Sequence, residues 1–404
     1  MLKAYRTLFT APGSLSFTFA GLLARLPLPM TGIGLITLIA QLQQSYALAG
    51  AVSASFVLTY ALVSPQLSRW VDNHGQRRVL PWASLVSIAG MLLILITSQQ
   101  QYHDGFLFAG AILTGFMPSM SAMIRARWTA LYRDKPQLQT AYSLETVFDE
   151  VTFIIGPPVA VGLAVLWFPE AGLLAAAILL LLGVLALVLQ KGTEPQLTSV
   201  LRNLEGNKSV IRLAAVQRLT LLMIALGTIV GTVDLVSVAF AHAIEQPAAA
   251  SLVLSAYASG SCLAGLFFGA RQFRLSLSRL LLLGGGAILL TTLPLLWVSS
   301  IYSLAFWIFW AGVAFAPTMI IAMSLVERTV PEHSTTEGMT WLLAGLNIGV
   351  ALGAALSGYF IERNGLQTGF IITSVSGGTV LVIAVWSYLK SGLVDNHADK
   401  YAKG

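Results

Sequence analysis

Residues 68–78 read Ser68-Arg69-Trp70-Val71-Asp72-Asn73-His74-Gly75-Gln76-Arg77-Arg78 and form a short polar stretch between two long apolar runs, at 46–68 and 80–98. Each run is close to the ~20 residues that an α-helix needs to cross the hydrocarbon core of a bilayer. The stretch therefore predicts a tight polar connection between two membrane-crossing helices.

The composition of the whole chain agrees with a membrane environment. Of the 404 residues, 56% are hydrophobic and 10% are charged, and the mean hydropathy is +0.79. A soluble domain carries about 25% charged residues, so this composition excludes a soluble enzyme, a secreted module and a disordered chain. The one cysteine, Cys262, excludes an intramolecular disulfide and a Cys-rich metal site.

Twelve apolar runs follow one another along the chain. They are too long and too even for the ~10-residue strands of a membrane barrel, whereas helices satisfy their own backbone groups in lipid. The sequence thus predicts an all-α membrane protein with twelve transmembrane helices. The expected spans cover residues 14–40, 46–68, 80–98, 105–126, 141–167, 170–190, 213–243, 249–270, 279–299, 301–326, 336–361 and 367–389.

The basic residues predict the orientation of these spans. All but two of the 23 Lys and Arg residues fall on one side, the exceptions being Arg25 inside the first span and Arg363. Basic loops stay in the cytoplasm, so both termini are expected there, in a bacterial-type inner membrane. The first span is too long for the apolar core of a signal peptide. The net charge of +6 is a topology signal and predicts no nucleic-acid partner.

The polar stretch at 68–78 resembles the signature loop of the major facilitator superfamily, Gly-x-x-x-Asp-Arg-x-Gly-x-Arg-Arg, at the position where that family carries it. Four residues match the pattern, while Ser68 replaces the first glycine and Asn73 replaces a basic residue; the matching residues are Asp72, Gly75, Arg77 and Arg78. The resemblance implies that this loop is a conformational latch, with Asp72 near the positive end of a helix. The alternative is that the two arginines only anchor the loop inside.

The same resemblance implies two pseudo-symmetric six-helix bundles that rock about a central cavity. The expected division of the chain is an N-terminal bundle at 1–190, a cytoplasmic linker at 191–212, a C-terminal bundle at 213–390 and a cytoplasmic tail at 391–404.

A second motif lies in the fifth span. Residues Gly156-Pro157-Pro158 resemble the Gly-Pro motif of the drug:proton antiporters in that superfamily, although the additional glycines of the motif are missing. The resemblance favours efflux. The alternative is a plain kink, since proline removes a backbone hydrogen bond within a helix.

Charges inside the spans are costly and mark functional candidates. The candidates for proton coupling and for the substrate cavity are Arg25, Glu145, Asp149, Glu150 and Asp234. We expect Arg25 and Asp149 to lie at similar depth, with Asp149 and Glu150 competing for Arg25, and Glu145 shallow enough to reach water or Arg125. Crowded carboxylates favour one that holds a proton near neutral pH, as a proton-coupled carrier needs. The alternative is a fixed structural salt bridge.

Three further residues are candidates for lining the cavity: Trp310, Asn347 and Tyr257. No metal-ligand cluster and no phosphate-binding glycine loop is present, so no cofactor is expected and ATP is not the driver.

The sequence as a whole predicts a secondary transporter, not an enzyme, that exports a small amphipathic or drug-like molecule in exchange for protons. Its expected partners are that molecule, protons and the bilayer, with no obligate protein partner. Two alternatives stay open: a proton-coupled uptake symporter of a metabolite, and a membrane enzyme or receptor. Short loops argue against the second alternative.

Overall fold

The computed structural model describes residues 2–43, 46–100, 103–195, 209–245, 249–271, 273 and 275–401. The described chain is helical. The N-terminal group of helices comprises α1 (Leu2–Leu8), α2 (Ser14–Arg25), α3 (Pro27–Gln43), α4 (Tyr46–His74), α5 (Gln76–Gln100), α6 (Gly105–Thr114), α7 (Met120–Tyr132), α8 (Gln137–Leu166) and α9 (Ala171–Leu189). The C-terminal group comprises α11 (Ala214–Ala243), α12 (Ala249–Ala270), α13 (Leu277–Thr292), α14 (Ile301–Thr329), α15 (Thr335–Asn364) and α16 (Gln367–Tyr401). Short 3-10 helices are η1 (Lys191–Thr193), η2 (Val210–Arg212), η3 (Leu293–Trp297) and η4 (Glu332–Ser334).

Eleven apolar segments in the described part of the chain are long enough to span a membrane. The expected fourth span differs from the others because it is split into α6, of 10 residues, and α7. Between them lies Gly115-Phe116-Met117-Pro118-Ser119, where Pro118 disfavours the helical conformation of the residue before it. The first span is divided in a milder way, since α3 begins at Pro27 directly after α2.

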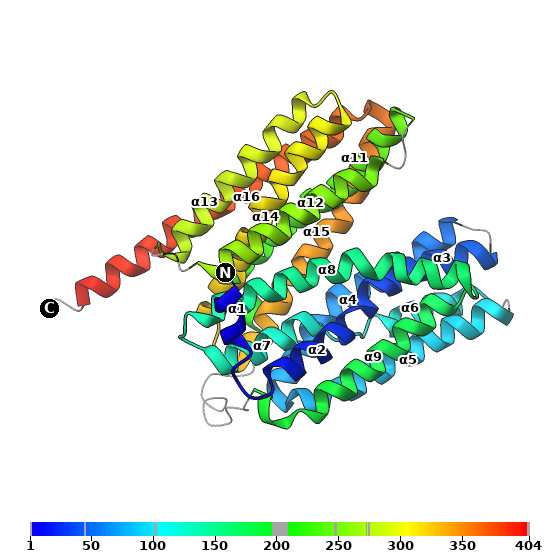
Figure 1. Ribbon diagram of the computed structural model, residues 1–404, viewed down its shortest axis with the longest axis horizontal. Helices are drawn as coiled ribbons and strands as arrows, with labels where there is room; N and C mark the ends of the chain where they lie inside the picture. The colour runs from blue at the N-terminus through cyan, green and yellow to red at the C-terminus, as the bar shows by residue number, and fades with distance from the viewer. Residues whose placement is uncertain are drawn as a thin grey trace.

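The helices form two groups that meet at one end and diverge towards the other (Figure 1). Within the C-terminal group α11 packs on α15, α12 on α14 and α13 on α16. Within the N-terminal group α5 packs on α6, α2 on α9 and α3 on α8. The two groups, called the N half and the C half below, touch mainly through α4 with α15 and through α8 with α12. We call this contact the seam.

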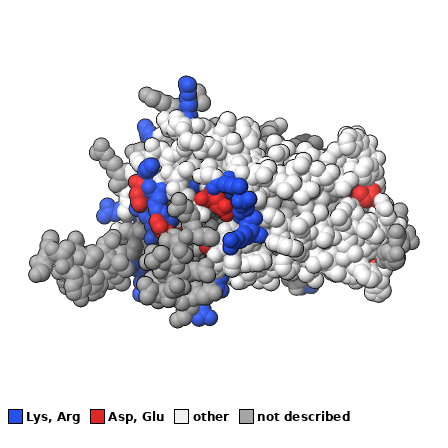
Figure 2. All heavy atoms as spheres, turned by 90° about the horizontal axis from the view of Figure 1, so that it is seen from below, with Lys and Arg blue, Asp and Glu red and all other residues white. Residues whose placement is uncertain are grey.

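Hydrogen bonds across the seam gather at the end that carries the basic loops. They join the last turns of α4 to the first turns of α15, and the first turns of α8 to the last turns of α12. Figure 2 shows Lys and Arg gathered towards this end and a largely uncharged surface beyond it. If the basic end is cytoplasmic, as the sequence predicts, the protein is closed towards the cytoplasm and faces outward.

The expected linker at 191–212 is described only at its two ends, and residues 196–208 lie outside the described part. Its first residues are held by the N half, because Arg127 Nη1 donates to Thr193 Oγ1 at 2.7 Å and the Arg77 backbone N–H donates to Glu194 Oε1 at 2.9 Å. The expected tail at 391–404 continues α16 as far as Tyr401. The division into two bundles, a linker and a tail stays a prediction.

The orientation can be tested by cysteine labelling in a Cys262→Ser background. Ser299 and Lys191 are both exposed, at opposite ends of the molecule. A membrane-impermeant maleimide applied to intact cells should modify Ser299→Cys and leave Lys191→Cys unmodified until the cells are opened. Labelling of Lys191→Cys from outside would reverse the orientation.

Candidate functional site

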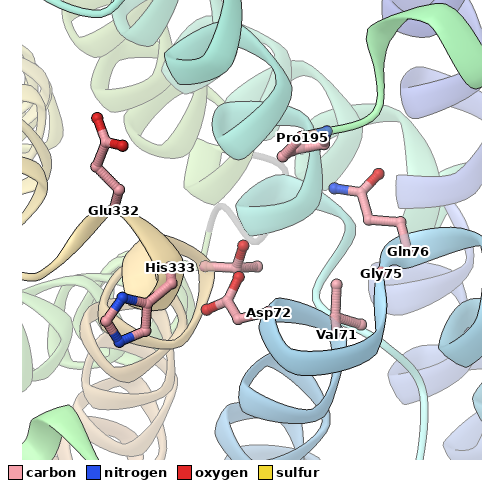
Figure 3. A pocket seen from close by; sticks show the side chains of 8 residues that line it. Val71, Asp72, Gly75, Gln76, Pro195, Glu332 and His333 are labelled. Atoms are coloured by element: carbon pink, nitrogen blue, oxygen red, sulfur yellow. The ribbon is translucent and has the colours of Figure 1, made fainter. Parts of the chain in front are cut away.

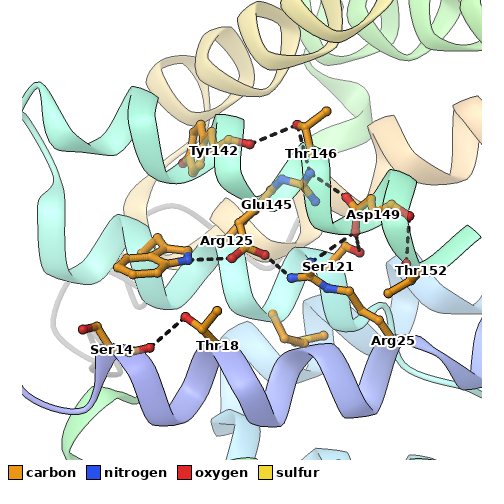
Figure 4. A network of polar contacts seen from close by, with 12 residues as sticks. Ser14, Thr18, Arg25, Ser121, Arg125, Tyr142, Glu145, Thr146, Asp149 and Thr152 are labelled. Carbon is orange, nitrogen blue, oxygen red and sulfur yellow. Dashed lines mark hydrogen bonds and ion pairs between the residues drawn. The ribbon is translucent and has the colours of Figure 1, made fainter. Parts of the chain in front are cut away.

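Four charged side chains meet inside the N half, contributed by α2, α7 and α8 (Figure 4). Arg25 forms a hydrogen-bonded ion pair with Glu145, and its Nη1 lies 3.4 Å from Asp149 Oδ1. Arg125 Nη2 lies 2.7 Å from Asp149 Oδ2. We call these residues the ion cluster; it balances two arginines against two carboxylates.

Helical spacing and burial make the ion cluster rigid. Glu145 and Asp149 are one turn apart on α8 and therefore share a face. Trp128 Nε1 of α7 donates to Glu145 Oε1 at 2.7 Å. Arg25 is 5% exposed, and Arg125 and Glu145 are 0% exposed. Removing one member would leave an uncompensated buried charge, at a cost of about 3–5 kcal/mol. The ion cluster thus fixes α2, α7 and α8 to one another.

The expectations about this region are partly confirmed and partly wrong. The contact between Arg25 and Asp149 confirms their matched depth. Glu145 reaches neither water nor Arg125, because it is fully buried and paired with Arg25. Arg125 neutralises Asp149 from within the N half, so the prediction of one arginine facing an excess of acids is wrong. The break between α6 and α7 allows α7 to place Arg125 there.

Glu150 does not compete for Arg25. Successive residues of a helix point about 100° apart, so Glu150 leaves the face of α8 that carries Asp149. Its Oε1 instead accepts a hydrogen bond from Ser261 Oγ of α12, at 2.9 Å, across the seam. In the described part of the chain it has no ion-pair partner. Asp234 of α11 is exposed and likewise has no ion pair among the described residues.

A small cavity lies beside the ion cluster. Its lining includes Arg25, Tyr60, Ser121 and Asp149, and its volume of about 20 Å³ has room for a water molecule. Arg25 keeps Nε and Nη1 without a hydrogen-bond acceptor among the described residues. The cavity can therefore supply water oxygens to buried guanidinium N–H groups.

At the polar stretch, Gly75 makes the turn between α4 and α5. Its φ of +90° is a conformation that side chains with a Cβ disfavour. Immediately before the turn, Asp72 Oδ2 accepts a hydrogen bond from the backbone N–H of Glu337, at 2.8 Å, in the first turn of α15. Figure 3 shows Asp72 pointing towards the segment that carries Glu332 and His333. A carboxylate at this place satisfies a free backbone N–H and meets the positive end of the helix dipole.

Glu337 extends this contact and gave no signal in the sequence. Its carboxylate accepts hydrogen bonds from Ser209 Oγ and, at 3.2 Å, from the Val210 backbone N–H, so it holds the end of the expected linker. Arg69 Nε lies 3.9 Å from Glu337 Oε2. Ser68 Oγ and Thr340 Oγ1, 2.7 Å apart, add a buried hydrogen bond across the seam. The small side chain of Ser68 permits this close approach.

The paired arginines of the stretch behave differently from Asp72. Arg77 and Arg78 are exposed, and the described residues include no carboxylate paired with either guanidinium. Of the charged residues that match the family pattern, Asp72 is the one for which the described structure shows a hydrogen bond to the start of α15. Whether the two arginines contribute to a latch or only anchor the loop stays a prediction.

The Gly-Pro motif lies within α8, which continues through Pro157 and Pro158. Gly156 allows α3 to approach closely, because a Cβ there would lie 2.8 Å from Pro29 Cγ. The glycine therefore has a packing role inside the N half, beside any kink that the prolines produce.

The three candidates for cavity lining are scattered. Trp310 of α14 is 43% exposed and Asn347 of α15 is half-buried. Tyr257 of α12 is buried, and its hydroxyl has no hydrogen-bond partner among the described residues. Tyr257 lies one turn before Ser261 and so shares the face of α12 that meets Glu150.

Comparison with known proteins identifies the family. The sequence model of the Major Facilitator Superfamily matches residues 17–246 and 221–400. Multidrug resistance protein 1 of Bacillus subtilis is 26% identical over 200 residues, which are 48% of this chain and 50% of that protein. The match thus spans about half the length of this curated relative.

Solved structures share the fold. A bacterial homologue of the iron transporter ferroportin, in an outward-facing state, superposes with a TM-score of 0.73 at 16% identity, covering 93% of this chain and 99% of that one. The Escherichia coli fucose:proton symporter gives a TM-score of 0.70 at 12% identity, covering 92% of this chain and 98% of that one. A human organic anion transporter superposes with a TM-score of 0.67 at 15% identity, covering 93% of this chain and 100% of that one.

Because Asp72 contacts the start of α15, we expect the negative charge of Asp72 to favour closure of the seam. In a Cys262→Ser background, Ser68→Cys places a thiol that is buried at the seam and reacts with a maleimide only after opening. Adding Asp72→Asn should speed this reaction about fivefold, because a charge at a helix end contributes up to about 1 kcal/mol. Asp104→Asn, an acid at the start of α6, is the control and should leave the rate unchanged. Equal rates with and without Asp72→Asn would leave the latch without support.

Proposed function

This chain belongs to the Major Facilitator Superfamily of membrane transporters, and we propose that it exports a small amphipathic cation in exchange for protons. The family assignment makes it a multi-pass secondary transporter of a small molecule and not an enzyme. The proposal adds the direction, the coupling ion and the charge of the substrate.

The observation that carries the proposal is the position of Glu150. Within six residues of α8 there are three acids, and two of them, Glu145 and Asp149, are neutralised by arginines of the N half. Glu150 faces the C half, where its contact is the neutral hydroxyl of Ser261. A carboxyl without a cation in the membrane interior binds a proton or a cationic ligand readily.

The contact of Glu150 also depends on the conformational state. Ser261 belongs to the C half, so rocking of one half against the other changes the distance between these two groups. In contrast, the ion cluster lies within the N half and moves as a unit. A proton on Glu150 is therefore linked to the movement of the halves, whereas a proton on Asp149 would first have to disrupt two ion pairs.

The surroundings of Glu150 suit an amphipathic cation. Asp234 of α11 and the Tyr257 hydroxyl of α12 lie within electrostatic range of Glu150. The Tyr257 ring packs against Phe315 of α14, with ring centroids 5.8 Å apart. Aromatic faces and carboxylates together attract an organic cation. A proton and such a cation neutralise the same carboxylate, so binding of one opposes binding of the other, which is the requirement for exchange.

Two observations support export as the direction. The Gly156-Pro157 pair lies in α8, where the antiporter motif is expected, and the curated relative is named for multidrug resistance. The orientation with both termini in the cytoplasm of a bacterial-type inner membrane belongs to the same proposal, because it makes the outward-facing end the side of release.

The proposal predicts distinct outcomes for the neighbouring acids of α8. Inverted vesicles whose interior is more acidic than the medium should accumulate tetraphenylphosphonium, a lipophilic cation. Glu150→Gln should abolish this gradient-driven accumulation and keep the melting temperature close to that of the unsubstituted protein. Asp149→Asn should lower the melting temperature, because Arg125 and Arg25 lose a buried counter-charge.

The neutral residue opposite Glu150 provides a control. Ser261→Ala removes one hydrogen bond and leaves the carboxyl, so gradient-driven accumulation should persist at an altered rate. Accumulation by Glu150→Gln at the unsubstituted rate would exclude Glu150 as the coupling group. Accumulation only with the gradient reversed would point to an uptake symporter.

A further inference from the structure

Carbonyl groups at the C-terminal end of α12 accept hydrogen bonds from side chains of the N half. The last carbonyl groups of a helix lack intrahelical donors and need partners from elsewhere. α12 ends at Ala270, at the seam, where it packs against α8 and α1. Its final carbonyl groups therefore need N–H or O–H donors from the N half or from water.

Three side chains of the N half donate to carbonyl groups in and just after the last turn of α12. Tyr5 OH of α1 donates to the Leu266 carbonyl at 2.7 Å. Thr140 Oγ1 of α8 donates to the Gly269 carbonyl at 2.6 Å. Gln139 Nε2 approaches two carbonyls, those of Phe268 at 3.2 Å and Arg271 at 3.3 Å. We call Tyr5, Gln139 and Thr140 the α12 cap.

The helix α1 moves with the N half. Tyr132 OH of α7 donates to the Leu8 carbonyl at 2.8 Å, and the Leu8 side chain is fully buried. Tyr5 is thus attached to the N half while its hydroxyl reaches the C half. α1 acts as a short strap across the seam.

Close approach at the α12 cap depends on Gly269. A Cβ at this position would lie 2.3 Å from Ser143 Cβ and 2.6 Å from Tyr5 OH. Any side chain here would have to push α8 and α1 away from α12. The glycine therefore permits the hydrogen bonds that the three donors make.

We infer that the α12 cap is a second clasp of the seam, made only when this end of the molecule is closed, and that it complements Asp72 at α15. Asp72 of the N half accepts from the start of a C-half helix, and the α12 cap of the N half donates to the end of another. When the halves separate at this end, both helix ends lose partners and must be hydrated. Tyr5, Gln139 and Thr140 are thus positioning residues for the conformational cycle and do not contact the substrate.

The inference can be tested without substrate. Nitroxide labels at Lys191→Cys, in the start of the linker that the N half holds, and at Arg279→Cys in the C half, in a Cys262→Ser background, report the distance between the halves at this end. Tyr5→Phe and Thr140→Val each remove one hydroxyl and keep the shape of the side chain. Each should raise the ratio of open to closed molecules about fivefold, since one net hydrogen bond contributes about 1 kcal/mol.

Matched variants separate a clasp from a general loss of stability. Thr140→Ser keeps the hydroxyl and should retain the closed distance. Thr373→Val removes a buried hydroxyl that bonds only within α16, to Gly369, and should not change the distance. Gly269→Ala should open the seam although it removes no hydrogen bond. A distance distribution in Tyr5→Phe/Thr140→Val identical to that of the unsubstituted protein would overturn the inference, as would a lower melting temperature with no change in distance.

Discussion

A helix that ends against another part of a protein leaves backbone N–H or C=O groups that must be satisfied there. The seam between the two halves is organised by this constraint. The start of α15 receives the carboxylate of Asp72, and the end of α12 receives the hydroxyl and amide donors of α1 and α8. The same rule applies within the N half, where Arg127 donates to the Leu187 and Gln190 carbonyls at the end of α9. The bonds across the seam need the two halves to be in contact at this end, so they favour the closed arrangement over an open one.

Such bonds can connect two states only if each half is rigid. The ion cluster provides this rigidity in the N half, since it joins α2 to the pair α7 and α8, which lies far from α2 in the sequence. The ion cluster also distinguishes the three acids of α8, because it includes two of them and leaves out the third. Glu145 and Asp149 face inward and are neutralised, whereas Glu150, on the next position of the helix, faces the seam. A step of one residue along the helix thus separates a structural role from the role in proton coupling that we propose.

Much of the fold follows from the sequence, because bilayer thickness and hydrophobicity are local properties. The spans and the short polar connection at 68–78 are of this kind, whereas the approach of Asp72 to a helix start is what the resemblance of that connection to a family motif implies. The pairings of Arg125 with Asp149 and of Glu145 with Arg25 follow from neither, because the break after Gly115, which repositions α7, has no hydrophobicity signal. Partners such as Ser261, Glu337 and Gln139 give no signal in the sequence, because isolated polar residues in helices are common and only the packing of two distant segments selects these three.

We propose that Glu150 exchanges a proton for the substrate. Ligand binding must then release that proton. Purified protein in weakly buffered detergent solution is mixed with tetraphenylphosphonium, and the pH change is recorded with an indicator dye. The unsubstituted protein should release protons, and folded Glu150→Gln should release none. Release of protons by Glu150→Gln equal to that of the unsubstituted protein would contradict it.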